Sequence, residues 1–171
     1  MERKLALALA FALAFSCLVQ AKSYSVPAAA VDYYLQPDGT VNVEQRVTYE
    51  LSGQFTELYL QEPTGLQISN EQGYCEGRQS CSFFTQQNNG WHELVLRDAF
   101  DSDTVTAVFD YTISGELLEQ RDTAQFFYKL FGDQWTVPIG RLTATVHMPP
   151  GVQYTDYFVH PPGLNYEIQD E

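Results

Sequence analysis

The residues best suited to metal chemistry are three aspartates in one short polar stretch. Asp98, Asp101 and Asp103 lie close together in the chain, between two segments with strand character. Carboxylate oxygens are the hard ligands that Ca²⁺ prefers. The spacing does not match an EF-hand loop, which needs a glycine at its sixth position and a glutamate at its twelfth. We therefore keep a calcium-stabilised module as one hypothesis, beside a solvated turn whose aspartates hydrogen-bond the local backbone. No other cofactor is expected.

Two cysteines, Cys75 and Cys81, enclose a short polar segment that contains Gly77. Their spacing is not the Cys-x-x-Cys of redox and zinc sites, and no histidine lies beside them. In an oxidising compartment two such thiols should pair. We expect a structural disulfide that pins a local loop and contributes about 2–3 kcal/mol of stability.

The sequence carries no recognisable catalytic motif. His92, His147 and His160 lie far apart, in no zinc-ligand spacing, and we expect them at strand or loop surfaces. No Gly-x-Ser-x-Gly elbow occurs. A carboxylate pair beside exposed Trp91 or Trp135 would instead give a carbohydrate-active or other acidic-residue hydrolase, which stays open as an alternative. We expect a protein that is not an enzyme.

Alternating apolar and polar residues indicate that these side chains are carried by β-strands. The clearest run is 41–51, and with the alternating 31–35 and the turn residues between them it predicts a hairpin. Segments 82–85 and 91–97 flank a polar stretch that ends in Asn89-Gly90, which predicts a second hairpin. Further strands are expected at 55–60, 65–69, 104–113 and 142–148, and a loop leading into a strand at 116–130.

This pattern predicts an all-β fold. Seven or more short strands, turn signals about every 8–12 residues and little helical periodicity are typical of a sandwich. We expect an antiparallel, immunoglobulin-like β-sandwich of about 7–9 strands, formed as a single domain by residues 22–171.

The first 21 residues have the three parts of a secretory signal. Arg3-Lys4 is the basic start, the apolar run extends from Leu5 to Val19, and Ala21 is the small residue at the expected cleavage point. This run is shorter than the roughly 20 residues of a membrane span. We expect a signal peptide over 1–21 and an extracytoplasmic protein, whether secreted, periplasmic or on the outer face of the cytoplasmic membrane. An uncleaved anchor and a lipidated Cys17 are the alternatives.

The charge balance limits the possible partners. The chain has 9 basic and 22 acidic residues, a net charge of −13, and loss of the leader would leave −14. So acidic a surface repels phosphate backbones, which excludes nucleic acid as a partner.

Three segments together carry a family resemblance. They are 24–44, which contains Pro37-Asp38-Gly39, then 48–55, and finally 128–139. The set resembles the N-terminal domain of the predicted membrane proteins called domain-of-unknown-function family 2207, and the last segment is its most specific part. In that segment we interpret Gly132 and Asp133 as a turn and Trp135 as a large side chain that fills one end of the core. Pro138 would end the hydrogen-bonded ladder. We therefore expect the motif to form a structural corner.

The resemblance implies a β-domain displayed outside the cytoplasmic membrane, tethered by later transmembrane helices and without an established activity. Only 22 residues follow Pro149, with no second apolar span. We expect a truncated or a secreted relative, so attachment through the N-terminal segment or through downstream chain stays open. Tyr154, Tyr157 and Phe158 form an aromatic set that we expect to dock on downstream chain or on a partner. The expected function is that of an interaction or structural module whose envelope or protein partner is unidentified.

Overall fold

The alternating runs form strands in the computed structural model, which describes residues 22–101, 103–129 and 135–159. The predicted signal peptide, Gly132, Asp133 and His160 lie outside the described residues. Within them the strands are β1 (Ser23–Leu35), β2 (Thr40–Ser52), β3 (Gln54–Pro63), β4 (Gln67–Cys75), β5 (Ser82–Asn88), β6 (Trp91–Asp101), β7 (Thr104–Ser114), β8 (Leu117–Glu119), β9 (Ala124–Phe126) and β10 (Leu142–His147).

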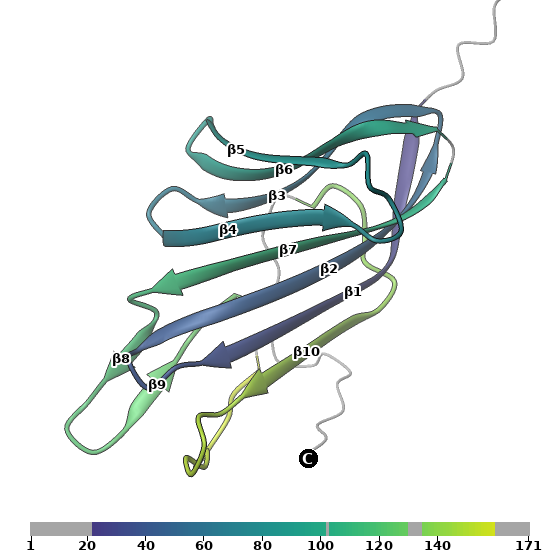
Figure 1. Cartoon of the computed structure of the whole chain (residues 1–171). Helices are drawn as coiled ribbons and strands as arrows, with labels where there is room; N and C mark the ends of the chain where they lie inside the picture. The colour runs from purple at the N-terminus through teal and green to yellow at the C-terminus, as the bar shows by residue number, and fades with distance from the viewer. Residues whose placement is uncertain (1–21, 102, 130–134, 160–171) are drawn as a thin grey trace, which may run out of the picture.

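Two sheets make up the body of the protein. One has five strands in the order β10-β1-β2-β7-β4, the second has three in the order β3-β6-β5, and β8 and β9 form a separate hairpin. Figure 1 shows the five strands side by side, with β3, β5 and β6 beyond β4 and the β8–β9 hairpin extending from the end of β7. Both predicted hairpins are confirmed, since β1 pairs with β2 and β5 pairs with β6, each antiparallel.

The core lies between the two sheets and is built from the apolar positions of the alternating runs. In β2, Val41, Val43, Val47 and Tyr49 are buried, as are Leu94 and Leu96 of β6. These side chains belong to one cluster with the inward residues of β1, β3 and β7. The predicted all-β architecture is therefore confirmed, and the described residues contain no helix.

The chain passes between the two sheets twice at one corner. β2 continues into β3 through Gly53, whose φ of +91° is in the left-handed region where glycine is favoured. β6 passes into β7 beside it, and Leu51 N donates to Asp103 O (2.8 Å) across the two crossings. The acidic stretch therefore lies at the corner where the ladder folds over from one sheet to the other.

Three features differ from the predictions. β10 pairs with β1 in parallel, so the large sheet is mixed rather than antiparallel. Residues 116–130, predicted as a loop leading into a strand, contain the β8–β9 hairpin. The first seven strands are arranged 1-2-7-4 over 3-6-5, whereas a constant-type immunoglobulin domain has 1-2-5-4 over 3-6-7.

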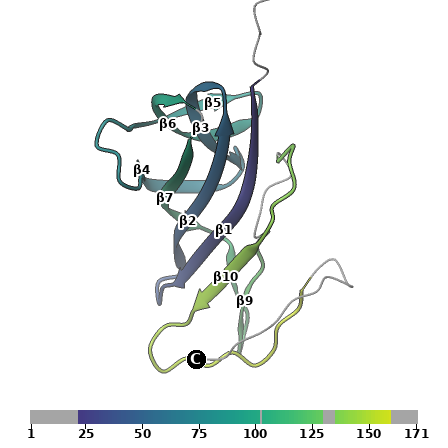
Figure 2. The same cartoon turned by 90° about the vertical axis from the view of Figure 1, so that its right-hand side faces the viewer.

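The parallel pairing of β10 with β1 is explained by where β10 begins. The described residues just before β10 lie beside the first half of β1 (Figure 2). There Gly140 N donates to Val26 O (2.9 Å) and Ala29 N donates to Arg141 O (2.8 Å). Because β10 begins beside the first half of β1, it runs in the same direction as β1.

No helix in the described part of the chain is long and apolar enough to cross a membrane.

Candidate functional site

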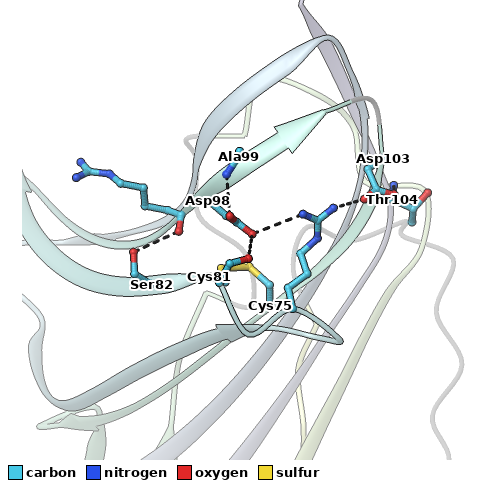
Figure 3. A network of polar contacts seen from close by, with 10 residues as sticks. Cys75, Cys81, Ser82, Asp98, Ala99, Asp103 and Thr104 are labelled. Carbon is cyan, nitrogen blue, oxygen red and sulfur yellow. Dashed lines mark hydrogen bonds and ion pairs between the residues drawn. A yellow bond between two sulfur atoms is a disulfide. The ribbon is translucent and has the colours of Figure 1, made fainter.

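The disulfide loop confirms the predicted cysteine pair. Cys75, at the end of β4, is bonded to Cys81, with 5.9 Å between their Cα atoms (Figure 3). The loop turns at Gly77, where φ is +72°, and Arg78 N donates to Cys75 O (3.1 Å). The bond holds the chain in a tight excursion between β4 of one sheet and β5 of the other, and it presents Arg78 to the acidic corner.

Arg78 contacts two of the three aspartates considered for calcium. Its guanidinium lies 3.5 Å from Asp98 Oδ2 and forms an ion pair with Asp103. Ser80 Oγ also donates to Asp98 Oδ2 (2.8 Å), and this hydrogen bond is the largest cause that holds the pKa of Asp98 below its usual value. Arg78 of the disulfide loop thus forms ion pairs with both of these aspartates at the acidic corner (Figure 3).

Asp101 faces elsewhere. It lines a shallow hollow of about 290 Å³ together with Lys22, Gly53 and Gln54. Asp103 Oδ1 accepts from the backbone N–H of Thr104 (2.8 Å). The described residues contain no group of three or more His, Cys, Asp or Glu side chains that could hold a metal ion.

The described part of the resemblance motif crosses the start of β1. Trp135 stacks on Tyr49, with 6.0 Å between ring centroids, and packs against the core. The Tyr24 and Thr136 hydroxyls are hydrogen-bonded (3.1 Å), and Ile139 bridges Val26 in parallel. Trp135 therefore packs beside the start of β1, while Pro138 is exposed one residue before the bridge.

The aromatic set near the end of the described chain is exposed. Tyr154, Tyr157 and Phe158 have 48%, 51% and 79% of their surface accessible. The two tyrosine rings contact each other edge to face, with 6.1 Å between centroids. This set follows β10 in the chain.

Two histidines have specific partners. His147 Nε2 donates to Asp32 Oδ1 (2.9 Å) on the outer face of the large sheet. His92 was expected at the surface, yet its side chain is only 16% exposed and its Nε2 lies 3.3 Å from Glu71 Oε1. The expectation for His92 was wrong, because its ring lies between Glu71 of β4 and Gln87 of β5, whose side chains contact its two nitrogens.

A buried carboxylate joins the two sheets and the later chain. Glu62 of β3 accepts from the Tyr111 hydroxyl of β7 and from the Tyr128 hydroxyl after β9, both at 2.9 Å. Tyr111 OH also lies 3.4 Å from Gln45 Oε1. Burial raises the pKa of Glu62, and the two tyrosine hydrogen bonds partly oppose that shift. The cluster is interior, so its role is to fasten Tyr128 to the core.

A second buried carboxylate lies on the outer face of the small sheet. Glu93 is 3% exposed and accepts from Gln61 Nε2 (2.6 Å), Gln86 Nε2 (2.6 Å) and Asn88 Nδ2 (3.1 Å). Three amide donors satisfy this carboxylate. The outer face of the small sheet is therefore closed over Glu93 by side chains from its two edge strands.

The outer face of the large sheet, in contrast, is hollowed. A shallow depression of about 200 Å³ extends over four strands, and among its lining residues are Tyr34 of β1, Asn42 and Glu44 of β2, Asn70 of β4, and Asp110 and Thr112 of β7. Tyr34 keeps 39% of its surface exposed. An aromatic ring, two carboxylates, two amides and a hydroxyl converge here, which makes this depression the candidate binding site.

None of the site residues predicted from the sequence lines this depression. Its polar members and Tyr34 occupy outward positions of strands whose inward positions form the core. The available signal was their alternation with buried residues, because Tyr34, Asn42 and Glu44 must share a face if β1 and β2 form a hairpin.

Residues 25–171 match the family described as predicted membrane protein (DUF2207) N-terminal domain. No curated protein matches the chain.

Some solved structures are similar in part. The chain is 16% identical to the M1 zinc metallopeptidase from Deinococcus radiodurans, over 75% of this chain and 33% of that one, with a TM-score of 0.41. A mutant of an M1 zinc metallopeptidase from Deinococcus radiodurans bound to a Tyr-Ser-Ala substrate gives 14% identity over 73% and 32% of the two chains, with a TM-score of 0.42. The chain thus spans about a third of the length of these structures.

Proposed function

The chain belongs to the DUF2207 N-terminal domain family of predicted membrane proteins, and from that premise we propose that it is a non-enzymatic extracytoplasmic interaction module. In this proposal it is the ectodomain of a membrane-anchored protein, and the two sheets serve as a sandwich scaffold. The signal-like leader and the disulfide support the extracytoplasmic side, because disulfides persist in oxidising compartments.

The observation that carries the proposal is the depression on the outer face of the large sheet. Its side chains stand on paired strands rather than on loops, so the backbone ladder holds them in place. We expect a site preformed in this way to bind with little backbone movement. The acidic surface makes the partner neutral or basic.

The hydrolase alternative needs an indole beside two carboxylates. Glu44 and Asp110 supply two carboxylates, but neither Trp91 nor Trp135 lines the depression. Trp135 instead stacks on Tyr49 against the core. Binding is therefore the better supported function for this site.

The calcium alternative has a competitor within the protein. Arg78 supplies positive charge to Asp98 and Asp103, the role that a cation would otherwise have. A calcium-stabilised module is thus less well supported than an interaction module that needs no calcium.

Two measurements test the proposal. An alkaline phosphatase fusion to the C-terminus of the chain reports the side of the membrane, because this enzyme is active only after export. Saturable binding of the purified protein to envelope fractions of the source organism reports the interaction. An inactive fusion contradicts the location, and the absence of saturable binding to every fraction contradicts the function.

A further inference from the structure

The depression on the large sheet is formed by two adjacent cross-strand rows. In one row Tyr34 pairs with Asn42, and Asn42 pairs with Thr112. In the next row Glu44 pairs with Asp110, and on its other side with Asp32, which lies outside the depression. One row therefore supplies an aromatic ring and neutral hydrogen-bonding groups, and the other supplies carboxylates.

The Tyr34 ring is fixed before any ligand arrives. His147 of β10 stacks on it, with 4.3 Å between centroids and 5° between the planes. His147 is in turn held by its hydrogen bond to Asp32 (2.9 Å). A half-exposed ring kept in one orientation is a platform that needs little further ordering when a ligand packs on it.

The neutral polar groups form a relay. Asn70 Nδ2 donates to Thr112 Oγ1 (3.3 Å), and Thr112 Oγ1 donates to Asn42 Oδ1 (2.9 Å). The relay leaves the Asn42 amide as a donor and the Asn70 carbonyl as an acceptor, since each amide has both. A ligand can therefore both donate to and accept from this row.

Asn70 reaches the depression because β4 is irregular. The pairing of β4 with β7 shifts register between Ser69 and Gln72, and Asn70 has a φ of +56°. A bulge of this kind redirects a side chain at a local conformational cost. The irregularity places the Asn70 amide over Thr112 of the neighbouring strand.

The carboxylates provide further acceptors. Glu44 Oε1 is bonded by Arg46 (2.9 Å from Nε), whereas no cation pairs with Asp110 among the described residues. Asp110 is half-buried, and burial followed by the nearby Glu44 charge raises its pKa. A ligand hydroxyl that donates to Asp110 would relieve this unfavourable environment.

We propose that the depression binds one sugar ring of a neutral saccharide, with Tyr34 packing against an apolar face of the ring while Asn42, Asn70 and Asp110 hydrogen-bond its hydroxyls. This inference rests on the proposed function, for which it names the ligand class. The volume of about 200 Å³ is below the roughly 300–1,000 Å³ of most small-molecule pockets, so the site accommodates one ring of a longer chain.

Other ligand classes fit the groups less well. An anion would be repelled by Glu44, Asp110 and Asp32. A bare ammonium group has no acceptor for the Asn42 amide donor. It would also lie near Arg46, whose guanidinium already neutralises Glu44. A neutral ligand with many hydroxyls uses the ring, the donors and the acceptors together.

The test is calorimetric titration of the purified protein with four probes, cellotetraose, maltotetraose, mannotetraose and N,N′,N″,N‴-tetraacetylchitotetraose. We expect at least one probe to bind saturably, with an affinity that does not change with salt because no ionic contact is involved. Tyr34→Ala should weaken that binding about tenfold, because the loss of one aromatic contact corresponds to a change in affinity of that size. Tyr34→Phe should retain it, because the ring remains.

The matched control is Tyr74→Ala. Tyr74 lies on the β4 strand, is 43% exposed and does not line the depression, so its replacement should leave the affinity unchanged. Thermal melting of each variant confirms that it is folded.

Two results would overturn the inference. One is that none of the four probes binds. The other is that Tyr34→Ala binds as tightly as the unaltered protein. If the probes fail but envelope fractions still bind saturably, the saccharide assignment is wrong and the interaction module stands. If both fail, the proposed function fails as well. Binding of spermidine that salt abolishes, without binding of the saccharides, would identify a cationic ligand instead.

Discussion

Replacement of Glu62 by glutamine should change how stability depends on pH. Glu62 is only 9% exposed, and burial raises its pKa above the ordinary 4.5. Below pH 4.5 the carboxyl is protonated in both the native and the unfolded state, so its contribution to stability is fully present. As the pH rises from there through the native pKa, the unfolded state loses its proton first and that contribution is lost.

The size of the effect follows from proton linkage. Across this window the native protein holds up to one proton more than the unfolded chain, so the Glu62 contribution to the unfolding free energy falls by up to about 1.4 kcal/mol per pH unit. Glu62→Gln removes this contribution at all pH values. Its amide can accept from one tyrosine hydroxyl and donate to the other, so the packing of Tyr111 and Tyr128 is preserved.

The assay is urea unfolding followed by tryptophan fluorescence from about pH 4 to about pH 8, for the unaltered protein and for Glu62→Gln. The difference between the two curves should decline with pH inside the window and be flat below it. Tyr128→Phe is an opposing control. It removes a hydrogen bond that lowers the pKa of Glu62, so the window should extend to higher pH. Parallel curves for unaltered protein and Glu62→Gln would refute the reasoning.

Three further predictions concern other parts of the fold. Replacing Cys75 and Cys81 together by serine should lower the unfolding free energy by about 2 kcal/mol, because the bond closes only a short loop; equal denaturant midpoints would contradict this. A chelator should leave the melting temperature unchanged in calorimetry, and a clear fall would support calcium at the acidic corner. Gly140→Ala should cost about 1–3 kcal/mol, since the added Cβ would lie 2.6 Å from Pro27 O, whereas Gly65→Ala, with nothing within 4 Å, is the neutral control.

The alternation of side chains predicts every described strand except β8 and β9, and most of the core. Val41, Val43, Val47 and Tyr49 are buried as the period of two requires, because one face of a strand must meet the opposite sheet. Gln45, at an inward position of the same run, is also buried, at 3% exposed. Its burial depends on Tyr111 and Glu62, which come from other strands, and nothing local indicates that partnership.

The pairing of β10 could not be predicted from its own residues. Leu142, Ala144 and Val146 alternate as expected of a strand, and the strand is present. Leu142 and Val146 are nevertheless 41% and 45% exposed. Alternation indicates which side chains share a face, but it gives neither the direction of the neighbouring strand nor the extent to which the opposite sheet covers that face. Those depend on the contacts that Ile139, Gly140 and Arg141 make with β1 just before β10 begins.

The same limit explains why the depression on the large sheet was missed while the acidic stretch was noticed. Asp98, Asp101 and Asp103 are neighbours in the chain, but they do not converge on one site. Arg78 from the disulfide loop contacts Asp98 and Asp103, whereas Asp101 lines a separate hollow. Tyr34 and Asp110, in contrast, are far apart in the chain and line one hollow, because β2 pairs with both of their strands. On a sheet the chemically relevant neighbours lie across strands, so a site is specified by register. A search for clustered residues along the sequence therefore favours loops. The depression instead arises from the antiparallel registers of β2 with β1 and with β7, and from the bulge in β4 at Asn70.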